Sequence, residues 1–158
     1  MASQNSVLAY DAERNADVFY KEIPDGANTL EFGYIHGNNK PMLIVGGNCS
    51  IQGFDEEAEE KFWTVTGDNV SATCFCDINN DGHPELIVGS DDYMIRAFKA
   101  ENPVFEISEA SKIIHLVTIK ENYFAYGLDN GSLGVYKEKQ RLWRVKAKHK
   151  VVSVVCVQ

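Results

Sequence analysis

The sequence lacks features that define several large classes of protein. It has no apolar run long enough to cross a bilayer, because its longest apolar stretches, such as Val151–Val157, have the length of a buried strand. Its first residues, Met1–Ser6, are polar and do not show the charged-then-apolar pattern of a signal peptide. Basic residues are scarce: 15 Lys and Arg stand against 23 Asp and Glu, for a formal charge of −8. A general nucleic-acid binder needs a basic surface, so that class is not expected.

Cysteine is also sparse, with four residues in the chain. No CxxC pair and no matching Cys and His spacing is present, so a zinc site is not expected. Cys74 and Cys76 are two residues apart in a strand-like segment, where both point to one face and pack as small hydrophobic residues. The sequence contains no phosphate-binding glycine loop and no nucleophile motif. We therefore expect a non-enzymatic, cytoplasmic chain with no certain cofactor.

Helical periodicity is absent, whereas a repeat of strand-type segments runs through the chain. Each copy has an apolar run ending in glycine, a polar turn, a run ending in an aromatic residue, a charged turn and a last run with an aromatic. The glycines Gly46, Gly89 and Gly127 are 43 and 38 residues apart. A period of this length that contains only strands indicates the four-stranded blades of a β-propeller.

The second and third copies each divide into four predicted strands. In chain order these are Ser71–Cys76, Glu85–Gly89, Met94–Lys99 and Pro103–Ile107, then Ile113–Thr118, Tyr123–Tyr126, Ser132–Tyr136 and Arg141–Val145. The segments between them, such as Asp129-Asn130-Gly131, contain the residue types of tight reversals.

Both ends of the chain are out of phase with this repeat. Val7–Asp11 and Asp17–Tyr20 match the last two strands of a blade. The predicted fold is all-β, a partial β-propeller of four-stranded antiparallel blades, with about three complete blades and a partial blade at each end. The predicted boundaries are 1–26 for the end of a blade, 27–67, 68–110 and 111–148 for complete blades, and 149–158 for the first strand of the next. Closed rings usually have four to eight blades, so we expect the terminal blades to pack against another copy or to meet in an incomplete fourth blade.

A loop between two predicted strands has the spacing of a calcium site. Oxygen ligands from Asp77, Asn79, Asp81 and Glu85 fall at loop positions one, three, five and nine, with the carbonyl of His83 at seven. The pattern resembles the FG-GAP loops of integrin-type propellers. The alternative is that the same side chains cap their own turn through hydrogen bonds, without metal.

A second candidate is the basic run from Lys137 to Lys150, which has seven Lys and Arg and one Glu. Arg144, Lys146 and Lys148 alternate, which places them on one face of a strand and its extension. They are candidate partner-binding residues for an acidic protein or a membrane surface. The alternative is protection of an outer edge strand against stray pairing.

Aromatic residues recur in the last strand of each copy. Trp63 and Trp143 align with Phe105 and Tyr20, so we expect them to pack between blades. Asp91-Asp92 lies in a predicted turn and is expected to be solvated.

Several segments together resemble the Bardet–Biedl syndrome 2 family of BBSome subunits. They are Asp25–Asn28, Gly46–Cys49, Gln52–Phe54, Phe62–Val70, Glu85–Ser90, Asp129–Tyr136 and Trp143-Arg144. The nine residues FWTVTGDNV, Phe62–Val70, are the most specific of these, and the resemblance extends over essentially the whole chain.

The resemblance implies a subunit of a coat-like complex that moves membrane proteins into and out of cilia and takes part in cilium assembly. The implied partners are other BBSome subunits and ciliary cargo tails, and the implied locations are the cytoplasm, the cilium, the ciliary base and, peripherally, the ciliary membrane. Members of the family are longer, with coiled-coil and appendage-type domains after the propeller. The alternative function is a calcium-binding, integrin-like adhesion propeller. A propeller enzyme would need ionisable residues that converge on a central channel, and the sequence shows no such set.

Overall fold

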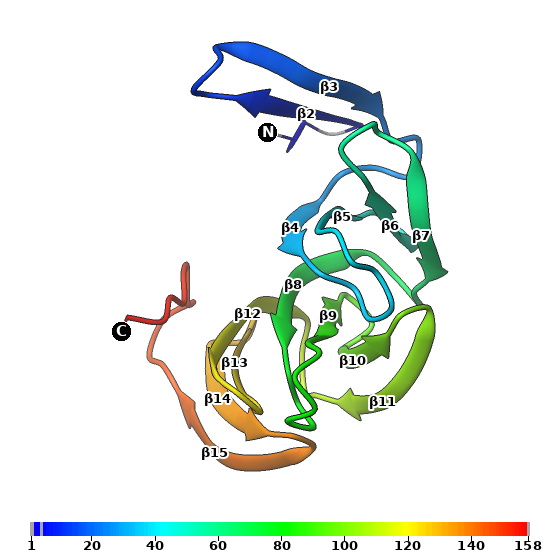
Figure 1. Ribbon diagram of the computed structural model, residues 1–158. Helices are drawn as coiled ribbons and strands as arrows, with labels where there is room; N and C mark the ends of the chain where they lie inside the picture. Colours follow the sequence, from blue (N-terminus) through cyan, green and yellow to red (C-terminus); the bar gives the residue numbers. More distant parts are fainter. Residues whose placement is uncertain (1, 4, 158) are drawn as a thin grey trace.

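The structure is a computed structural model that describes residues 2, 3 and 5–157, with side chains from residue 5 onward. The described residues form β-strands, turns and irregular segments, and no helix long and apolar enough to span a membrane occurs among them. The strands form antiparallel sheets that follow one another around an open arc (Figure 1). The all-β prediction and the four-stranded blades are confirmed.

Each sheet uses strands that are consecutive in the sequence. The first sheet contains β1 (Ala2–Ser3), β2 (Ser6–Asp11) and β3 (Ala16–Glu22), and the second contains β4 (Thr29–Gly33), β5 (Met42–Gly46), β6 (Ser50–Phe54) and β7 (Glu60–Val65). The third contains β8 (Val70–Cys76), β9 (Glu85–Ser90), β10 (Met94–Lys99) and β11 (Asn102–Ser108), and the fourth β12 (Ile113–Lys120), β13 (Tyr123–Leu128), β14 (Ser132–Lys137) and β15 (Gln140–Lys146). In each four-stranded sheet the first strand lies on the inner side of the arc and the last on the outer side (Figure 1).

The hairpins between strands depend on residues that tolerate a left-handed backbone. Asn122, with φ of 54°, turns β12 into β13, and Gly131, with φ of 85°, turns β13 into β14. Asparagine and glycine adopt this conformation at low steric cost, which is why the predicted turns fall where the structure has them.

The cores lie between successive sheets rather than within one. Between the second and third sheets, Ile44 and Phe62 pack with Leu86 and Phe98 in one buried cluster. A second cluster joins the third sheet to the fourth, and it includes Cys74 and Cys76. Burial raises the pKa of both of these thiols to about 12, so they remain protonated and pack as small hydrophobic side chains, as predicted.

The repeated glycines have a steric cause. A Cβ on Gly46 would lie 2.4 Å from Cγ1 of Val70, and a Cβ on Gly89 would lie 2.3 Å from Cγ2 of Ile113. Val70 begins β8 and Ile113 begins β12, so the first strand of the following sheet occupies the space in which a side chain would lie. Both glycines therefore mark a close approach of one sheet to the next.

A bulge recurs where the last two strands of each sheet pair. It falls between Ala9 and Tyr10, Gly53 and Phe54, Ala97 and Phe98, and Val135 and Tyr136. The residues that pair with the position just before it are Phe19, Phe62, Phe105 and Trp143.

This register corrects the sequence alignment of the aromatic residues. Phe62, which is 3% exposed, is the equivalent of Phe105, whereas its neighbour Trp63 points to the opposite face and is 49% exposed. Tyr20 is likewise one residue past Phe19 and is exposed. The prediction that Trp63 packs between blades was wrong, because successive strand residues face opposite sides and a slip of one residue reverses the side.

Residues 147–157, which we call the tail, do not form the strand that was predicted over 149–158. Residue 158 lies outside the described part of the chain. The tail nevertheless runs beside β12: Val151 O lies 3.4 Å from Nε2 of His115, and Cys156 Sγ lies 3.8 Å from the carbonyl oxygen of Ile119. No described strand adjoins its outer edge, so it has no partner with which to form a hydrogen-bonded ladder.

The tail lies against β12 much as β12 lies against β8. Ser71 Oγ donates a hydrogen bond to the carbonyl oxygen of Ile113, and Cys76 Sγ lies 3.9 Å from that of Lys120. The start of β8 thus contacts the start of β12, and the end of β8 contacts the end of β12. In the same way, Val151 of the tail lies near the start of β12 and Cys156 lies near its end. The tail therefore occupies the place of a next inner strand without strand hydrogen bonds.

Candidate functional site

The calcium-like loop connects β8 to β9, and its first aspartate is bonded to the backbone of the loop itself. Oδ1 of Asp77 accepts a hydrogen bond from the backbone N–H of Asp81 at 3.1 Å, and Oδ2 accepts one from Gly82 at 2.8 Å. Oδ1 of Asn79 accepts a second bond from the N–H of Asp81, at 3.0 Å. Both side chains thus stabilise the turn in the way that Asx turns do.

Asp81 and Glu85 are held by other partners. Lys99 on β10 donates to Oδ2 of Asp81 at 2.9 Å, and this bond, with others from the loop, lowers the pKa of Asp81 to about 2. Glu85 begins β9 and is 1% exposed; it accepts a bond at 3.1 Å from the N–H of Ile78. Burial raises the pKa of Glu85, and the bond from Ile78 opposes that effect.

This arrangement fits the capped turn more directly than a calcium centre. Among residues 5–157, no group of three or more His, Cys, Asp or Glu side chains is placed to hold a metal ion. Calcium at Asp81 would compete with Lys99 for the same carboxylate. The ring of His83, whose carbonyl was the expected fifth ligand, lies against the ring of His36 in the connection between β4 and β5, with centroids 5.2 Å apart. Calcium binding by Asp77, Asn79, Asp81, His83 and Glu85 stays a prediction.

The basic run divides into two parts in the structure. Arg144, on β15, has Nη1 3.9 Å from a carboxylate oxygen of Glu109, and Arg141 lies at the same distance. The Glu109 side chain is 1% exposed and also accepts a hydrogen bond from the hydroxyl of Tyr136. Arg144 therefore helps to neutralise a buried carboxylate in the connection between β11 and β12.

Lys146 and Lys148 differ from Arg144. Both are exposed, and within residues 5–157 neither takes part in an ion pair. Lys146 ends β15, and Lys148 lies beyond it in the tail, so the alternation on one regular strand ends at Lys146. These two lysines are the members of the predicted set that are open to a partner.

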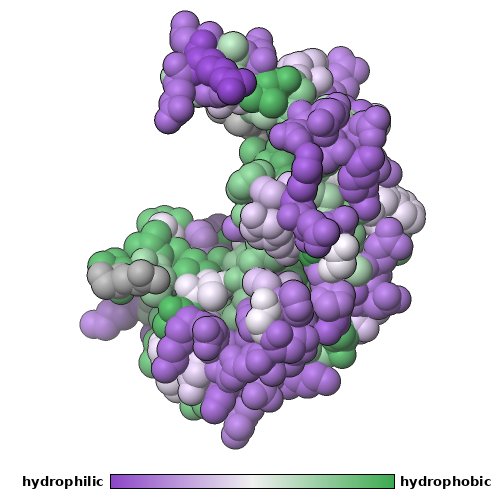
Figure 2. Space-filling model, viewed as in Figure 1, coloured by the Kyte–Doolittle hydropathy of each residue, from purple (hydrophilic) through white to green (hydrophobic). Residues whose placement is uncertain are grey.

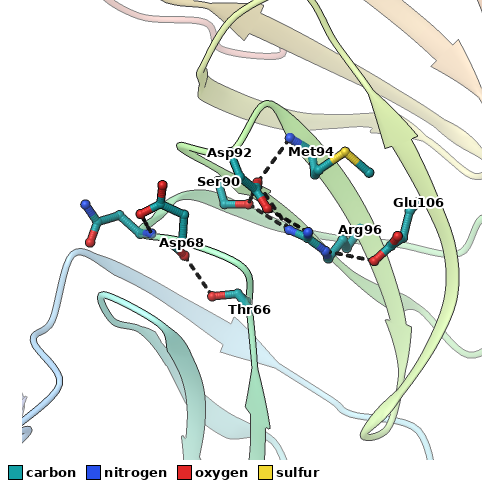
Figure 3. Close-up of polar contacts among 8 residues, drawn as sticks. Thr66, Asp68, Ser90, Asp92, Met94, Arg96 and Glu106 are labelled. Atoms are coloured by element: carbon teal, nitrogen blue, oxygen red, sulfur yellow. Dashed lines mark hydrogen bonds and ion pairs between the residues drawn. The ribbon is translucent and has the colours of Figure 1, made fainter.

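Sequence reasoning missed a polar network in the third sheet (Figure 3). Nη2 of Arg96 lies 2.6 Å from Asp92, Nε lies 2.9 Å from Glu106, and Nη1 donates to Ser90 Oγ at 3.0 Å. The Arg96 side chain is only 13% exposed. Burial acts to raise the pKa of Asp92, but bonds from Arg96 and Ser90 outweigh it and lower the pKa. The expectation that Asp92 is a solvated turn residue was wrong.

The network also contacts the connection between the second and third sheets. A Cβ on Gly67 would lie 2.4 Å from Oδ2 of Asp92, while Thr66 Oγ1 donates to the carbonyl oxygen of Asp68 at 2.8 Å (Figure 3). The sequence signal for this network was the four-residue spacing of Asp92 and Arg96, because the hairpin between β9 and β10 brings residues so spaced together. The Arg96 guanidinium thus pairs with two carboxylates of its own sheet, so the network stabilises the hairpin of β9 and β10 and its pairing with β11.

A hollow of about 740 Å³ opens where β11 meets the turn between β14 and β15. Ile78 and Phe105 contribute apolar side chains, and Lys137 and Lys139 lie at its basic side. Nζ of Lys139 lies 5.4 Å from the centroid of the Phe105 ring. Glu85 and Glu138 also line it, so the hollow combines apolar side chains with charges of both signs.

Comparison with protein-family models gives two matches. Residues 72–158 match the model described as "Ciliary BBSome complex subunit 2, middle region", and residues 1–33 match "Ciliary BBSome complex subunit 2, N-terminal". The curated relative "BBSome complex member BBS2" of Rattus norvegicus is 45% identical over 98% of this chain and 21% of its own length. The corresponding protein of Danio rerio is 46% identical over 98% of this chain and 22% of its own length. The chain thus spans about a fifth of the length of these relatives.

Solved structures agree on the fold. BBS1N, from its crystal structure in complex with ARL6DN, has a TM-score of 0.78 at 12% identity, covering 98% of this chain and 50% of that one. The Pan2 WD40 domain of Neurospora crassa has a TM-score of 0.73 at 12% identity, covering 91% of this chain and 44% of that one. At these identities the likeness concerns the propeller fold alone.

Proposed function

Because the chain belongs to the family of ciliary BBSome complex subunit 2, we propose that it is a non-enzymatic scaffold that contributes propeller surfaces to the BBSome. The observation that carries the proposal is identity of 39% to 46% to BBSome members over 98% of the chain. The structure adds surfaces suited to protein contacts, namely a hydrophilic outer side (Figure 2) and the exposed Lys146 and Lys148.

The proposed partners are other BBSome subunits and the cytoplasmic tails of ciliary cargo. The proposed locations are the cytoplasm, the cilium and its base, with attachment to the ciliary membrane only through the complex. The integrin-like adhesion function finds no support among the comparisons, whose family matches are to BBSome subunits. Calcium binding at the β8–β9 loop is a separate proposal that does not depend on either function.

Co-purification from ciliated cells tests the proposal. The tagged full-length protein is expected to recover other BBSome subunits, identified by mass spectrometry. Reversing the charge of Lys146 and Lys148 tests whether this end of the arc contributes, and the matched control reverses Lys137 and Lys139 in the hollow beside Phe105. Failure of the full-length protein to recover any BBSome subunit would overturn the proposed function.

A further inference from the structure

We propose that Tyr93, in the turn between β9 and β10, is a recognition residue that stacks on an arginine from a basic segment of another protein. The inference goes beyond the proposed function, because it names the chemistry of one contact and does not require the partner to be a BBSome subunit. It rests on the backbone conformation of Tyr93, the exposure of its ring and the charges around it. The residues of the proposed contact lie in the complete third sheet and in its connections to the second and fourth sheets.

Tyr93 has a backbone conformation that bulky residues avoid. Its φ is 70°, in the left-handed region, where Cβ approaches a carbonyl oxygen of the chain. Among the described residues, Tyr93 is the one aromatic residue with such a φ. The other residues besides glycine that share the conformation are Asn15, Ala58, Asn80, Ala100, Asn122 and Glu138. The tyrosine thus occupies a position for which asparagine or glycine is better suited.

The corresponding turn of the fourth sheet has glycine at this position, namely Gly131 with φ of 85°. In both turns the N–H of this residue donates to the carbonyl oxygen three residues earlier, at 3.3 Å for Tyr93 and 3.1 Å for Gly131. In both, the side chain of the preceding residue, Asp92 or Asn130, accepts a bond from the N–H of the residue that follows. The backbone of the turn therefore gives no reason for an aromatic side chain.

The ring of Tyr93 does not belong to the core either. Tyr93 is 45% exposed and is not a member of the three buried clusters of the described residues. Departures from local conformational preference concentrate at functional sites, where the side chain serves a purpose other than stability. Tyrosine is also enriched among the residues that dominate protein–protein binding. We therefore assign this ring to a contact with another molecule.

The backbone around Tyr93 is held from several sides. Its carbonyl oxygen accepts a hydrogen bond from the N–H of Glu109 at 2.8 Å, in the connection between β11 and β12. The N–H of Asp91 donates to the connection between β7 and β8 at 3.0 Å. Asp92 is bonded to Arg96 in the polar network of the third sheet (Figure 3). A ring on a backbone fixed in this way loses little conformational entropy on binding, which favours a preorganised contact.

One carboxylate beside this turn has no cation. Asp91 pairs with Lys112 at 2.9 Å, whereas Asp68 accepts a bond from the N–H of Asn69 and takes part in no ion pair within residues 5–157. The bond with Asp91 raises the pKa of Lys112, and Asp68 and Tyr93 add to that effect, so both lie near the same ammonium group. Asp68 and the Tyr93 ring are therefore close enough to contact one partner side chain.

Arginine is the side chain that fits this pair. Its planar guanidinium stacks on an aromatic face, and its N–H groups bond a carboxylate at the same time. An acidic segment is disfavoured because it would meet Asp68 and Asp91, and the formal charge of −8 attracts basic segments to the chain. The proposed occupant is thus a basic segment whose arginine contacts Tyr93 and Asp68.

Photo-crosslinking from position 93 is the direct test. The full-length protein with Tyr93→p-benzoylphenylalanine is irradiated in ciliated cells, and the attached peptides are identified by mass spectrometry. The expected peptide belongs to another protein and has arginine next to the point of attachment. Tyr20, which is 61% exposed on an ordinary strand, is the matched control position and is expected not to attach to that peptide. Absence of a cross-link to another protein, or attachment only to segments without basic residues, overturns the inference.

Substitutions separate recognition from folding. Tyr93→Asn introduces a residue that tolerates the left-handed backbone, so the 158-residue chain is expected to unfold at the same urea concentration or a higher one. In the full-length protein the same variant is expected to weaken binding of the cross-linked partner by at least about fivefold. Asp68→Asn is expected to act in the same direction, whereas Tyr93→Phe keeps the stacking ring and Tyr20→Asn is the control, and both are expected to retain binding.

Two results from these variants would contradict the inference. Unfolding of Tyr93→Asn at a clearly lower urea concentration would assign the ring to the stability of the fold. Unchanged binding of the partner by Tyr93→Asn would remove Tyr93 from the contact. Recovery of BBSome subunits by the unaltered full-length protein is a separate measurement, and its failure would bear on the proposed function alone.

Discussion

Phe105 and Trp143 occupy the same register position in successive sheets, each paired with the residue that precedes the bulge, yet Phe105 is 8% exposed and Trp143 is 49% exposed. The difference comes from the neighbours. The turn between β14 and β15 lies over Phe105, with Lys139 above its ring, and no described segment covers Trp143 in the same way. Burial of an outer-strand aromatic residue in this fold is therefore a property of the following sheet rather than of its own sheet.

The register of β7 predicts opposite outcomes for two adjacent aromatic residues. Phe62→Ala is expected to lower the free energy of unfolding by about 3–5 kcal/mol, because it leaves a cavity between the second and third sheets. Trp63→Ala removes an exposed ring and is expected to cost less than about 1 kcal/mol. Urea unfolding followed by circular dichroism measures both. A larger loss of stability for Trp63→Ala than for Phe62→Ala would contradict this register and support the alignment of Trp63 with Phe105.

The close approach of Gly89 to Ile113 predicts overpacking on substitution. Gly89→Ala is expected to destabilise the chain by about 1–3 kcal/mol, because the two sheets cannot separate freely. Gly127→Ala is the control, since its Cβ would meet only the side chain of His115, at 3.2 Å, and a smaller loss is expected. Thermal unfolding of both variants and of G89A/I113A tests whether overpacking is the cause. If it is, truncating Ile113 in the Gly89→Ala variant should recover part of the lost stability. Additive losses in G89A/I113A would contradict it.

The bond between Lys99 and Asp81 predicts a titration at low pH. The pKa of Asp81 is about 2 in the folded chain, below its ordinary value of 3.8, so its ionised form favours the folded state. That contribution is present above about pH 4 and is lost as the pH falls toward 2. In Lys99→Gln the Asp81 pKa, measured by NMR, is expected to rise toward its ordinary value. An unchanged value would mean that the backbone bonds of the loop, not Lys99, set it.

The calcium prediction for the β8–β9 loop is tested by isothermal calorimetry on the folded chain with millimolar calcium. Binding is expected to become tighter in Lys99→Ala, because Lys99 then no longer competes for Asp81. Asp77→Ala and Asp81→Ala are expected to abolish it, whereas Asp91→Ala in the next turn is a matched control. Absence of heat in both the unaltered chain and Lys99→Ala would dispose of the calcium site.

Local patterns in the sequence were sufficient for the strands. Met94–Lys99 was predicted with the bounds of β10, and the remaining strands of the third and fourth sheets differ by at most two residues at an end. Such accuracy follows from alternating burial and from turn residues, both of which are local. The bulge opposite Phe62 was not predictable, because it depends on how β6 and β7 pair, and its omission shifted the alignment onto Trp63.

The candidate sites were less accessible to sequence reasoning. The spacing from Asp77 to Glu85 identified a real loop, but the role of Lys99 depends on a strand that lies later in the chain. Arg144 was grouped with Lys146 by alternation alone, and its contact with Glu109 arises from a different connection. Long-range charge pairs of this kind require the packed structure.

The glycine contacts have a consequence for the geometry of the whole arc. Gly46 against Val70 and Gly89 against Ile113 let the first strand of one sheet sit almost on the backbone of the sheet before it. Sheets that approach so closely near the axis must fan apart toward the rim, and the angle between them sets how many are needed for a full turn. The absence of a side chain at Gly46 and at Gly89 thus helps to determine the curvature of the arc.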